Sequence, residues 1–232
     1  MKNILLIGGS YGIGYELAKE LQQEYTVFVA CRTSENLFGL QVTHIPFDAT
    51  TDTLDASKLP DILDGLVYCP GSINLRPFRG LKIETFESDM HLNFFSMVKV
   101  IQGVLPQLTA SEQSSIVLFS SVAVKMGMPF HTSVAAAKGA IEGFAKALAA
   151  EYAPKIRVNI IAPSLTDTPL ADKFLSNEEK KEKSAQRHPL KRVGTTEDIA
   201  QMASFLLDKK SSWISGQIFH VDGGMSALLI NT

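Results

Sequence analysis

The sequence predicts an α/β protein, built as one doubly wound domain over residues 1–232 with a seven-stranded parallel sheet and helices on both faces. Three observations predict it. Short apolar runs without strict polar alternation recur along the chain, which is typical of parallel strands covered on both faces. Helical patterns lie between these runs, and such alternation produces a parallel sheet with right-handed crossovers. A glycine-rich turn joins the first apolar run to the first helical pattern.

The apolar runs and helical stripes define the expected elements in order. The first helix is predicted by Ile13, Leu17 and Leu21, which recur at i, i+4 and i+8. A second apolar stripe over 134–148 has the same periodicity and predicts a later helix. The strands are expected at 4–7, 26–30, 43–47, 65–68, 115–119, 157–161 and 217–221.

Two connections depart from a regular alternation of strands and helices. Residues 31–42, between the second and third strands, are too few for a full crossover helix. Residues 164–194 form a long polar connection, and such a connection in a compact domain is usually a functional lid or a mobile loop. The charge run 178–183 inside it is more simply a solvated helix face. We therefore expect a single domain with a substrate lid at 164–194.

The composition narrows the classes of partner. The chain has 22 Lys and Arg against 24 Asp and Glu, a net charge of −2. A nucleic-acid binder or a polybasic membrane protein needs a strong positive field, so neither is expected. Two cysteines cannot form a disulfide framework and supply too few ligands for structural zinc, so we expect free thiols and no metal site. The apolar run 4–7 is too short for a signal peptide or a membrane helix, so the expected location is cytoplasmic.

The glycine-rich turn after the first strand is the expected cofactor loop. Glycines permit a tight turn and let the backbone approach a pyrophosphate, whose charge lies at the following helix N-terminus. A plain tight turn would use the same residues, but the strand before and the helix after meet the context that this motif requires. The loop therefore predicts Rossmann-type dinucleotide binding by Gly8, Ser10, Tyr11, Gly12, Ile13 and Gly14.

The end of the second strand indicates which nicotinamide cofactor the loop prefers. An NAD site normally has an acidic residue here for the ribose 2′-hydroxyl, whereas an arginine accommodates the additional phosphate of NADP. This strand ends in Cys31-Arg32-Thr33, and no Asp or Glu stands between Val27 and Ser34. We therefore expect Arg32 and Thr33 to bind NADP(H) in preference to NAD(H).

Further motifs follow in a fixed order along the chain. Asp48-Ala49 follows the third strand, Asn93 lies in a central helical stretch, and Lys138 opens a Lys-Gly-Ala-Ile-Glu-Gly segment before a closing Val-Asp-Gly-Gly turn at 221–224. With the glycine-rich loop, these motifs resemble the short-chain dehydrogenase/reductase family over essentially the full length. The likeness is strongest to its branch of ketoacyl-carrier-protein reductases.

This resemblance implies hydride transfer between NAD(P)H and a carbonyl or alcohol of a small-molecule substrate. The strand 217–221 and the tail after Gly224 resemble the segment through which family members associate, so a homodimer or homotetramer is expected. The resemblance also implies further cofactor contacts along the carboxyl edge of the sheet. These fall on Asp48, Ala49, Pro70, Gly71, Lys138, Pro163, Leu165, Thr166 and Thr168.

The resemblance implies a catalytic set of Ser, Tyr, Lys and Asn, of which this chain retains Ser121, Lys138 and Asn93. Ser121 stands 17 residues before Lys138, which equals the family spacing of 13 from serine to tyrosine plus 4 from tyrosine to lysine. The tyrosine's place is therefore taken by Val134. Valine cannot donate a proton, and a positioned general acid contributes about 10²–10⁴-fold to a reaction rate.

One interpretation of Val134 is that another residue donates the proton. His131 stands seven residues before Lys138, which resembles the spacing of tyrosine and lysine in the enoyl-reductase branch, and a histidine titrates near neutrality. A simpler interpretation makes His131 a polar residue ahead of a helix cap at Thr132 or Ser133.

Two other interpretations stay open, while Tyr68 and His91 are further candidates for the proton donor. The chain is similar to the dienoyl-CoA reductases, which also lack the tyrosine, and reduction of a conjugated C=C tolerates that loss better. Asn93, Ser121 and Lys138 would then polarise the carbonyl and hold the cofactor. Alternatively, the protein binds NADP(H) without turnover, as a redox-responsive module.

Overall fold

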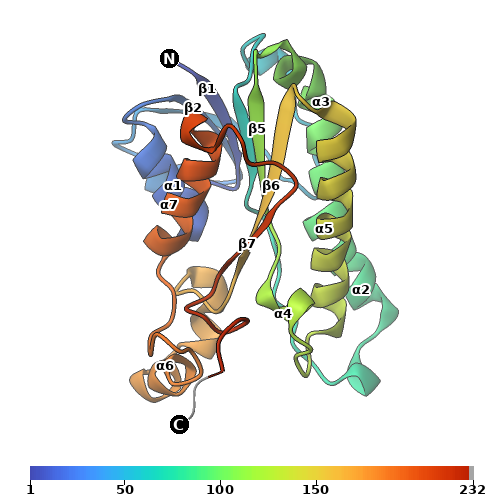
Figure 1. Cartoon of the computed structure of the whole chain (residues 1–232), viewed down its shortest axis with the longest axis vertical. Coiled ribbons are helices and arrows are strands. Elements are labelled where there is room, and N and C mark those ends of the chain that lie inside the picture. Colours follow the sequence, from blue (N-terminus) through green and yellow to red (C-terminus); the bar gives the residue numbers. More distant parts are fainter. Residues whose placement is uncertain (230–232) are drawn as a thin grey trace.

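The computed structural model describes residues 1–229, and its strands form one parallel sheet in the order β3-β2-β1-β4-β5-β6-β7 (Figure 1). The order reverses between β1 and β4, which is the switch point at which doubly wound sheets bind ligands. The strands are β1 Asn3–Ile7, β2 Thr26–Cys31, β3 Val42–Pro46, β4 Gly65–Tyr68, β5 Ser114–Phe119, β6 Ile156–Pro163 and β7 Ile218–Val221.

This sheet confirms the predicted fold class. Each predicted strand exists, and the ends differ by at most two residues, the largest difference being the extension of β6 to Pro163. The central strands β4 and β5 are buried along their whole length, which explains why their sequences are apolar without alternation. The third strand begins one residue earlier than predicted, at Val42.

Helices cover both faces of the sheet, as predicted. In Figure 1, α1 (Gly12–Leu21) and α7 (Thr196–Leu207) lie side by side on one face, and α3 (Ser96–Ala110) and α5 (Thr132–Tyr152) lie on the other. Helix α2 (Ile83–Met90) packs against α5. The two predicted apolar stripes are the buried faces of α1 and α5. They belong to two separate hydrophobic clusters, one on each face of the sheet.

Two local details of the helices concern the site. The prediction of a cap at Thr132 or Ser133 was wrong, because α5 begins at Thr132 with His131 at its N-cap position and no side-chain cap. Ser133 is instead buried and donates a hydrogen bond to Asp89, 44 residues earlier. Between α2 and α3 the helix widens into a π-helical turn, His91–Phe95, which turns Asn93 toward the interior. Such turns are frequent at functional sites.

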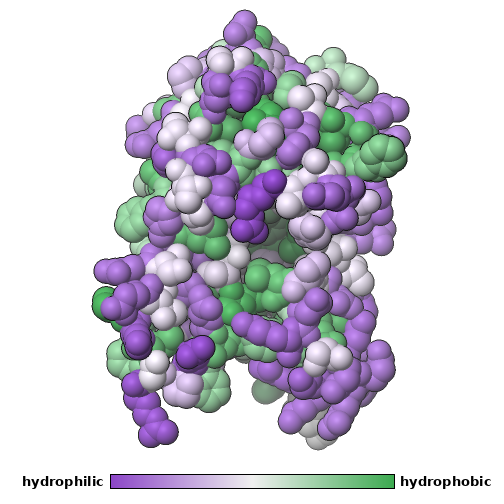
Figure 2. Space-filling model, turned by 180° about the vertical axis from the view of Figure 1, so that it is seen from behind, coloured by the Kyte–Doolittle hydropathy of each residue, from purple (hydrophilic) through white to green (hydrophobic). Residues whose placement is uncertain are grey.

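The first irregular connection lacks a crossover helix, and the charge run of the second lies on a solvated helix face, both as predicted. Residues 31–42 contain only a short 3₁₀ turn, Glu35–Leu37, and no crossover helix. The connection 164–194 holds a 3₁₀ segment, Pro169–Phe174, and the short helix α6 (Glu178–Ala185), whose charge run is largely solvent-exposed. Figure 1 places α6 beyond the carboxyl ends of the strands. Seen from behind that view, the molecular surface in Figure 2 has a hollow near its centre, with apolar side chains around it.

Another short helix, α4 (Val122–Lys125), directly follows β5. None of the helices in residues 1–229 is both long enough and apolar enough to cross a membrane. The two cysteines are free thiols, with Cys31 buried and Cys69 partly buried. The part of the tail predicted to mediate association is described only as far as Leu229, and the remaining residues 230–232 lie outside the described chain.

Candidate functional site

The glycine-rich loop forms an open cradle between β1 and α1. Gly8 and Gly12 have φ angles of +79° and +56°, a left-handed conformation that favours glycine. A Cβ on Gly14 would lie 2.2 Å from the Gly8 carbonyl oxygen, so only glycine allows the helix to pack this close to the strand. Tyr11, at the N-cap, provides no side-chain cap, and the first turn has no acidic residue. The first amides of α1 are therefore left for an external anion, which fits a diphosphate.

Residues at the end of β2 border this loop. The Thr33 hydroxyl donates to Ser10 Oγ at 3.3 Å, and Asn36 Nδ2 donates to the Ser10 carbonyl at 3.0 Å. Arg32 is exposed and makes no hydrogen bond or ion pair within residues 1–229, so its guanidinium is available to a ligand. Sequence reasoning missed Asn36, because an exposed asparagine in a loop carries no signal of the backbone it will contact.

The end of β3 contributes a carboxylate to the same edge. Asp48 accepts hydrogen bonds from the Thr50 amide at 2.8 Å and the Thr50 hydroxyl at 2.6 Å. These bonds, with a smaller effect of Arg32, lower the pKa of Asp48. Ala49 packs against the hydrophobic cluster below it. Asp48 is thus an acceptor held by Thr50 at the carboxyl edge of the sheet, where the resemblance predicts a cofactor contact.

The end of β4 brings the loop, the π-helical turn and α5 together. A Cβ on Gly8 would lie 3.1 Å from the Pro70 ring. A Cβ on Gly71 would lie 3.2 Å from Asn93 Oδ1 and 3.4 Å from Lys138 Nζ, so both polar atoms approach the same backbone point. Asn93 Oδ1 is buried and has no hydrogen-bond partner in the described part of the chain. A buried acceptor without a partner is costly unless a ligand or water satisfies it.

Lys138 is the buried cation of this site. Its Nζ donates to the Phe119 carbonyl at 3.0 Å. Burial lowers the pKa of Lys138 to about 8, while the nearby Cys69 and Asp89 act in the opposite direction. Burial also raises the pKa of the Cys69 thiol to about 12. A lysine with a pKa near neutrality, in a cleft, is a functional-site candidate.

The remaining predicted catalytic residues lie around the start of α5. Ser121 caps α4, where its Oγ accepts from the Ala123 amide at 3.2 Å, and it has no hydrogen bond to Lys138 within the described residues. Val134 is 5% exposed, one helical turn before Lys138. His131 is partly exposed, with Nδ1 2.7 Å from the Pro129 carbonyl oxygen. Seven helical residues span about 10 Å, which is the separation of the His131 and Lys138 backbones along the helix axis.

The turn after β6 closes the site from the other side. Thr166 donates to the Ser164 carbonyl at 3.0 Å, and the Gly194 amide donates to the Leu165 carbonyl at 3.1 Å. A Cβ on Gly12 would lie 3.5 Å from the Thr168 side chain, so this turn reaches the start of α1. Pro163 ends the strand itself. Of the contacts predicted on this turn, Thr168 therefore lies against the glycine-rich loop, while Leu165 and Thr166 are bonded to Gly194 and Ser164.

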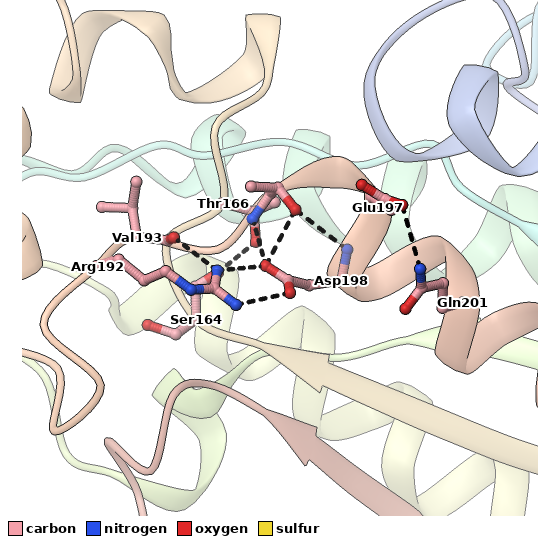
Figure 3. Close-up of polar contacts among 8 residues, drawn as sticks. Ser164, Thr166, Arg192, Val193, Glu197, Asp198 and Gln201 are labelled. Carbon is pink, nitrogen blue, oxygen red and sulfur yellow. Dashed lines mark hydrogen bonds and ion pairs between the residues drawn. The ribbon is translucent and has the colours of Figure 1, made fainter.

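A cavity of about 190 Å³ is lined by residues of this turn, among them Ser164 and Thr166, and by Arg192 and Asp198. Figure 3 shows the polar contacts of these side chains. Arg192 binds both carboxylate oxygens of Asp198, at 2.5 and 2.8 Å, and Thr195 and Asp198 form a reciprocal capping box at the start of α7. On its other wall, Ser164 Oγ lies 2.6 Å from His188 Nε2. No group of three or more His, Cys, Asp or Glu able to hold a metal ion occurs within residues 1–229.

Known proteins are similar to this chain in both sequence and fold. Residues 8–226 match the family described as Enoyl-(Acyl carrier protein) reductase. The 3-oxoacyl-(acyl-carrier-protein) reductase FabG of Chlamydia trachomatis is 32% identical over an alignment of 243 residues that covers 97% of each chain. The Inactive 2-(S)-hydroxypropyl-CoM dehydrogenase 2 of Xanthobacter autotrophicus is 34% identical over 171 residues, which cover 72% of this chain and 74% of that protein.

Among solved structures, ElxO with NADP bound has a TM-score of 0.89 and 26% sequence identity, covering 98% of this chain and 99% of that one. The fold, the order of the motifs and the two sequence matches agree with one another. The chain belongs to the short-chain dehydrogenase/reductase family of oxidoreductases.

Proposed function

We propose that the protein is an NADP(H)-dependent oxidoreductase that delivers hydride to a carbonyl or conjugated C=C substrate, at a site that lacks the usual tyrosine acid. The observation that carries this proposal is the approach of Asn93 Oδ1 and Lys138 Nζ to the backbone of Gly71, beside the glycine-rich loop. One acceptor and one cation at the carboxyl end of β4 are suited to the hydroxyls of a cofactor ribose. The uncapped first turn of α1 is suited to the diphosphate.

The preference for NADP(H) rests on the end of β2. Arg32 is exposed, faces no acidic partner in an ion pair within residues 1–229, and lies near the Ser10–Thr33 hydroxyl pair. A guanidinium and two hydroxyls match the 2′-phosphate of NADP, which carries negative charge and several acceptor oxygens. The NADP bound to ElxO, a structural relative, supports the same cofactor class.

The chain's own residues have separable roles in this proposal. The nicotinamide supplies the hydride when the cofactor is bound. Lys138 holds the ribose with its charged Nζ, and Asn93 offers its free Oδ1 beside it. Ser121, at the end of β5, donates a hydrogen bond to the substrate oxygen, where negative charge develops. The connection 164–194 covers the substrate and excludes water.

Val134 decides which substrates are favoured. Its buried aliphatic side chain supplies no proton, so reduction of a simple ketone would lack the general acid at this position. Hydride addition to a conjugated C=C places the new bond on carbon and leaves an enolate, which water can protonate. We therefore favour an α,β-unsaturated substrate, such as an enone or dienoyl thioester.

Three other side chains are candidate proton donors. The Tyr68 hydroxyl is buried and donates to the Leu92 carbonyl at 2.8 Å, and burial raises the pKa of Tyr68. His91 is exposed and its ring contacts the Thr50 carbonyl at 2.8 Å. His131 is partly exposed at the start of α5, the helix that carries Lys138.

The second candidate function is NADP(H) binding without turnover. A relative in Xanthobacter autotrophicus that is 34% identical over 171 residues carries the word inactive in its name, which supports this alternative. Lys138 would be useful for ribose binding alone. The retained Ser121 favours catalysis over this alternative, since a binding module has no need of a donor at the substrate oxygen.

The experiment that separates these functions is a substrate panel. Purified protein is mixed with NADPH and with enones, dienoyl thioesters, ketones or quinones, and the absorbance of NADPH is followed. The proposal predicts consumption with an unsaturated substrate and much slower consumption with simple ketones. Ser121→Ala, which removes the donor, should reduce the rate about 10²–10³-fold, the usual effect of losing one oxyanion donor.

Val134→Tyr provides the matched gain-of-function variant. If wild-type protein consumes NADPH with none of the substrates while Val134→Tyr reduces ketones, the binding module is the better description. If wild-type protein reduces simple ketones as fast as enones, the assignment of substrate class is wrong. A His131→Ala variant with full activity would remove that histidine as the donor.

A further inference from the structure

A buried carboxylate lies next to the proposed cofactor-binding residues. Asp89, near the end of α2, is 0% exposed. Ser72 Oγ and Asn74 Nδ2 donate to its Oδ1 at 2.5 and 2.7 Å, and Ser133 Oγ donates to its Oδ2 at 2.5 Å. Three donors on two oxygens form the environment of an ionised carboxylate, which only accepts hydrogen bonds.

This charge has no conventional counter-ion. Among the residues that the structure describes, no Lys, Arg or His forms an ion pair or hydrogen bond with Asp89. A buried charge is costly unless opposite charge lies nearby. The cation on which Asp89 acts is Lys138, which is itself buried and bound to a neutral carbonyl. Each of the two buried charges therefore offsets part of the desolvation cost of the other.

Asn93 connects the carboxylate to the cofactor site. Its Nδ2 donates to Ser72 Oγ at 2.9 Å and to the Asp89 carbonyl at 2.8 Å. Both amide protons are thereby used on the Asp89 side, which fixes the orientation of the amide and turns Oδ1 toward Gly71. Lys138 Nζ approaches the same point of Gly71 from α5.

We propose that Asp89 is a positioning residue of the cofactor site, whose fixed negative charge holds Lys138 as a cation and whose contact with Ser72 orients Asn93. The inference rests on the proposed function, because Lys138 and Asn93 are taken to hold the cofactor. Val134, one turn before Lys138, offers no acidic hydroxyl to face the lysine. The residues come from three separate segments, 72–74, 89–93 and 133–138.

Other titratable groups around Lys138 do not take this role. Cys69, from the loop after β4, is neutral near pH 8, because burial raises its thiol pKa to about 12. Glu142, one turn later on α5, accepts a hydrogen bond from Ser120 at 2.6 Å. Strand β5 and the π-helical turn contribute the Phe119 carbonyl and the Asn93 amide, which are uncharged. Asp89 is thus the negative charge that acts on Lys138 at neutral pH.

The test is the pH dependence of NADPH binding, followed by fluorescence from pH 7 to pH 10. Wild-type affinity should fall as pH rises past about 8, where Lys138 loses its proton. Asp89→Asn keeps the size of the side chain and removes the charge. The midpoint of the fall in NADPH affinity with pH should therefore move to a lower pH, by on the order of one unit. A shift of one unit makes NADPH binding about twofold weaker at pH 7 and about tenfold weaker at pH 9.

Matched variants separate charge from structure. Glu87→Gln removes an exposed charge from the same helix and should leave the midpoint unchanged. Asp89→Glu retains the charge and should retain the wild-type midpoint even if the melting temperature falls, and this variant also serves if Asp89→Asn does not fold. Lys138→Arg should bind NADPH with no midpoint in this range, because arginine stays charged.

The outcomes are distinct. A folded Asp89→Asn with the wild-type midpoint, or an Asp89→Glu whose midpoint moves as far as that of Asp89→Asn, overturns the proposal and leaves Asp89 a structural residue. Wild-type protein that binds no NADPH at any pH overturns the proposed function together with this inference. A downward shift in Asp89→Asn that vanishes in the Lys138→Arg background supports both.

Discussion

Gly14→Ala perturbs the closest backbone approach in the glycine-rich loop. The added Cβ would lie 2.2 Å from the Gly8 carbonyl oxygen and 3.1 Å from the Gly9 Cα, both backbone atoms that cannot rotate away. Ordinary contact begins at 3.4 Å, so strand and helix must separate by roughly 1 Å. The helix would move as a body, and with it the amides that face the expected diphosphate.

Two magnitudes follow from this clash. Overpacking costs about 1–3 kcal/mol, and in a chain of this size each kcal/mol lowers the melting temperature by about 2–4 °C, so a decrease of about 2–12 °C is expected. The displacement also weakens at least one hydrogen bond to a charged phosphate, worth about 1.5–3 kcal/mol, which corresponds to roughly 10–100-fold weaker NADPH binding.

The assay combines thermal unfolding with a fluorescence titration of NADPH. Gly143→Ala is the control, because nothing lies within 4 Å of its added Cβ in the middle of α5. Alanine there should stabilise the helix by about 0.5–1 kcal/mol and leave NADPH affinity unchanged. A Gly14→Ala protein with the wild-type melting temperature and wild-type affinity would refute the account of the loop.

Three further predictions concern the cofactor, the fold and the assembly. Arg32→Ala should weaken NADPH binding about 10–100-fold in titrations and leave NADH binding nearly unchanged, since only the 2′-phosphate is lost as a partner; equal losses would contradict this role. Asp198 has a pKa well below its usual range because of Arg192, so its stabilisation is present above about pH 4 and is lost as pH falls below that. Asp198→Asn should therefore destabilise the protein by about 1 kcal/mol at pH 7, seen as a lower melting temperature, and this difference should shrink steadily as pH falls from about 4 to 2; an equal difference at pH 7 and pH 2 would contradict the pair's role. Light scattering should give two or four times the chain mass, and a monomer would contradict the expected association.

Much of the fold was predictable because its determinants are local. The apolar runs predicted all seven strands, because a parallel strand covered on both faces has no solvent-facing side and its sequence is therefore a nearly continuous apolar run. The glycine-rich loop was predictable for the same reason, because the glycines that its backbone requires at Gly8, Gly12 and Gly14 are neighbours in sequence. The start of α5 was predicted wrongly, because Ser133 resembles a capping residue until its tertiary partner is known.

The carboxylate cluster could not be predicted from sequence. Asp89 stands among Glu84, Glu87 and Ser88, where it resembles one more solvated residue of an amphipathic helix. Its burial is decided by the packing of α2 on α5, and its donors come from segments 17 residues before and 44 residues after it. Asn36 is similar, since its contact with the Ser10 carbonyl depends on how β2 and the glycine-rich loop meet.

The proposed function depends on NADP(H) binding through the glycine-rich loop and Arg32. The most direct measurement is a titration of wild-type protein with NADPH and, separately, with NADH, followed by nucleotide fluorescence. The account predicts saturable NADPH binding at micromolar concentrations and NADH binding at least about tenfold weaker, the effect of one lost charge-assisted contact. Binding of neither nucleotide at tens of micromolar, or tighter binding of NADH, would contradict it.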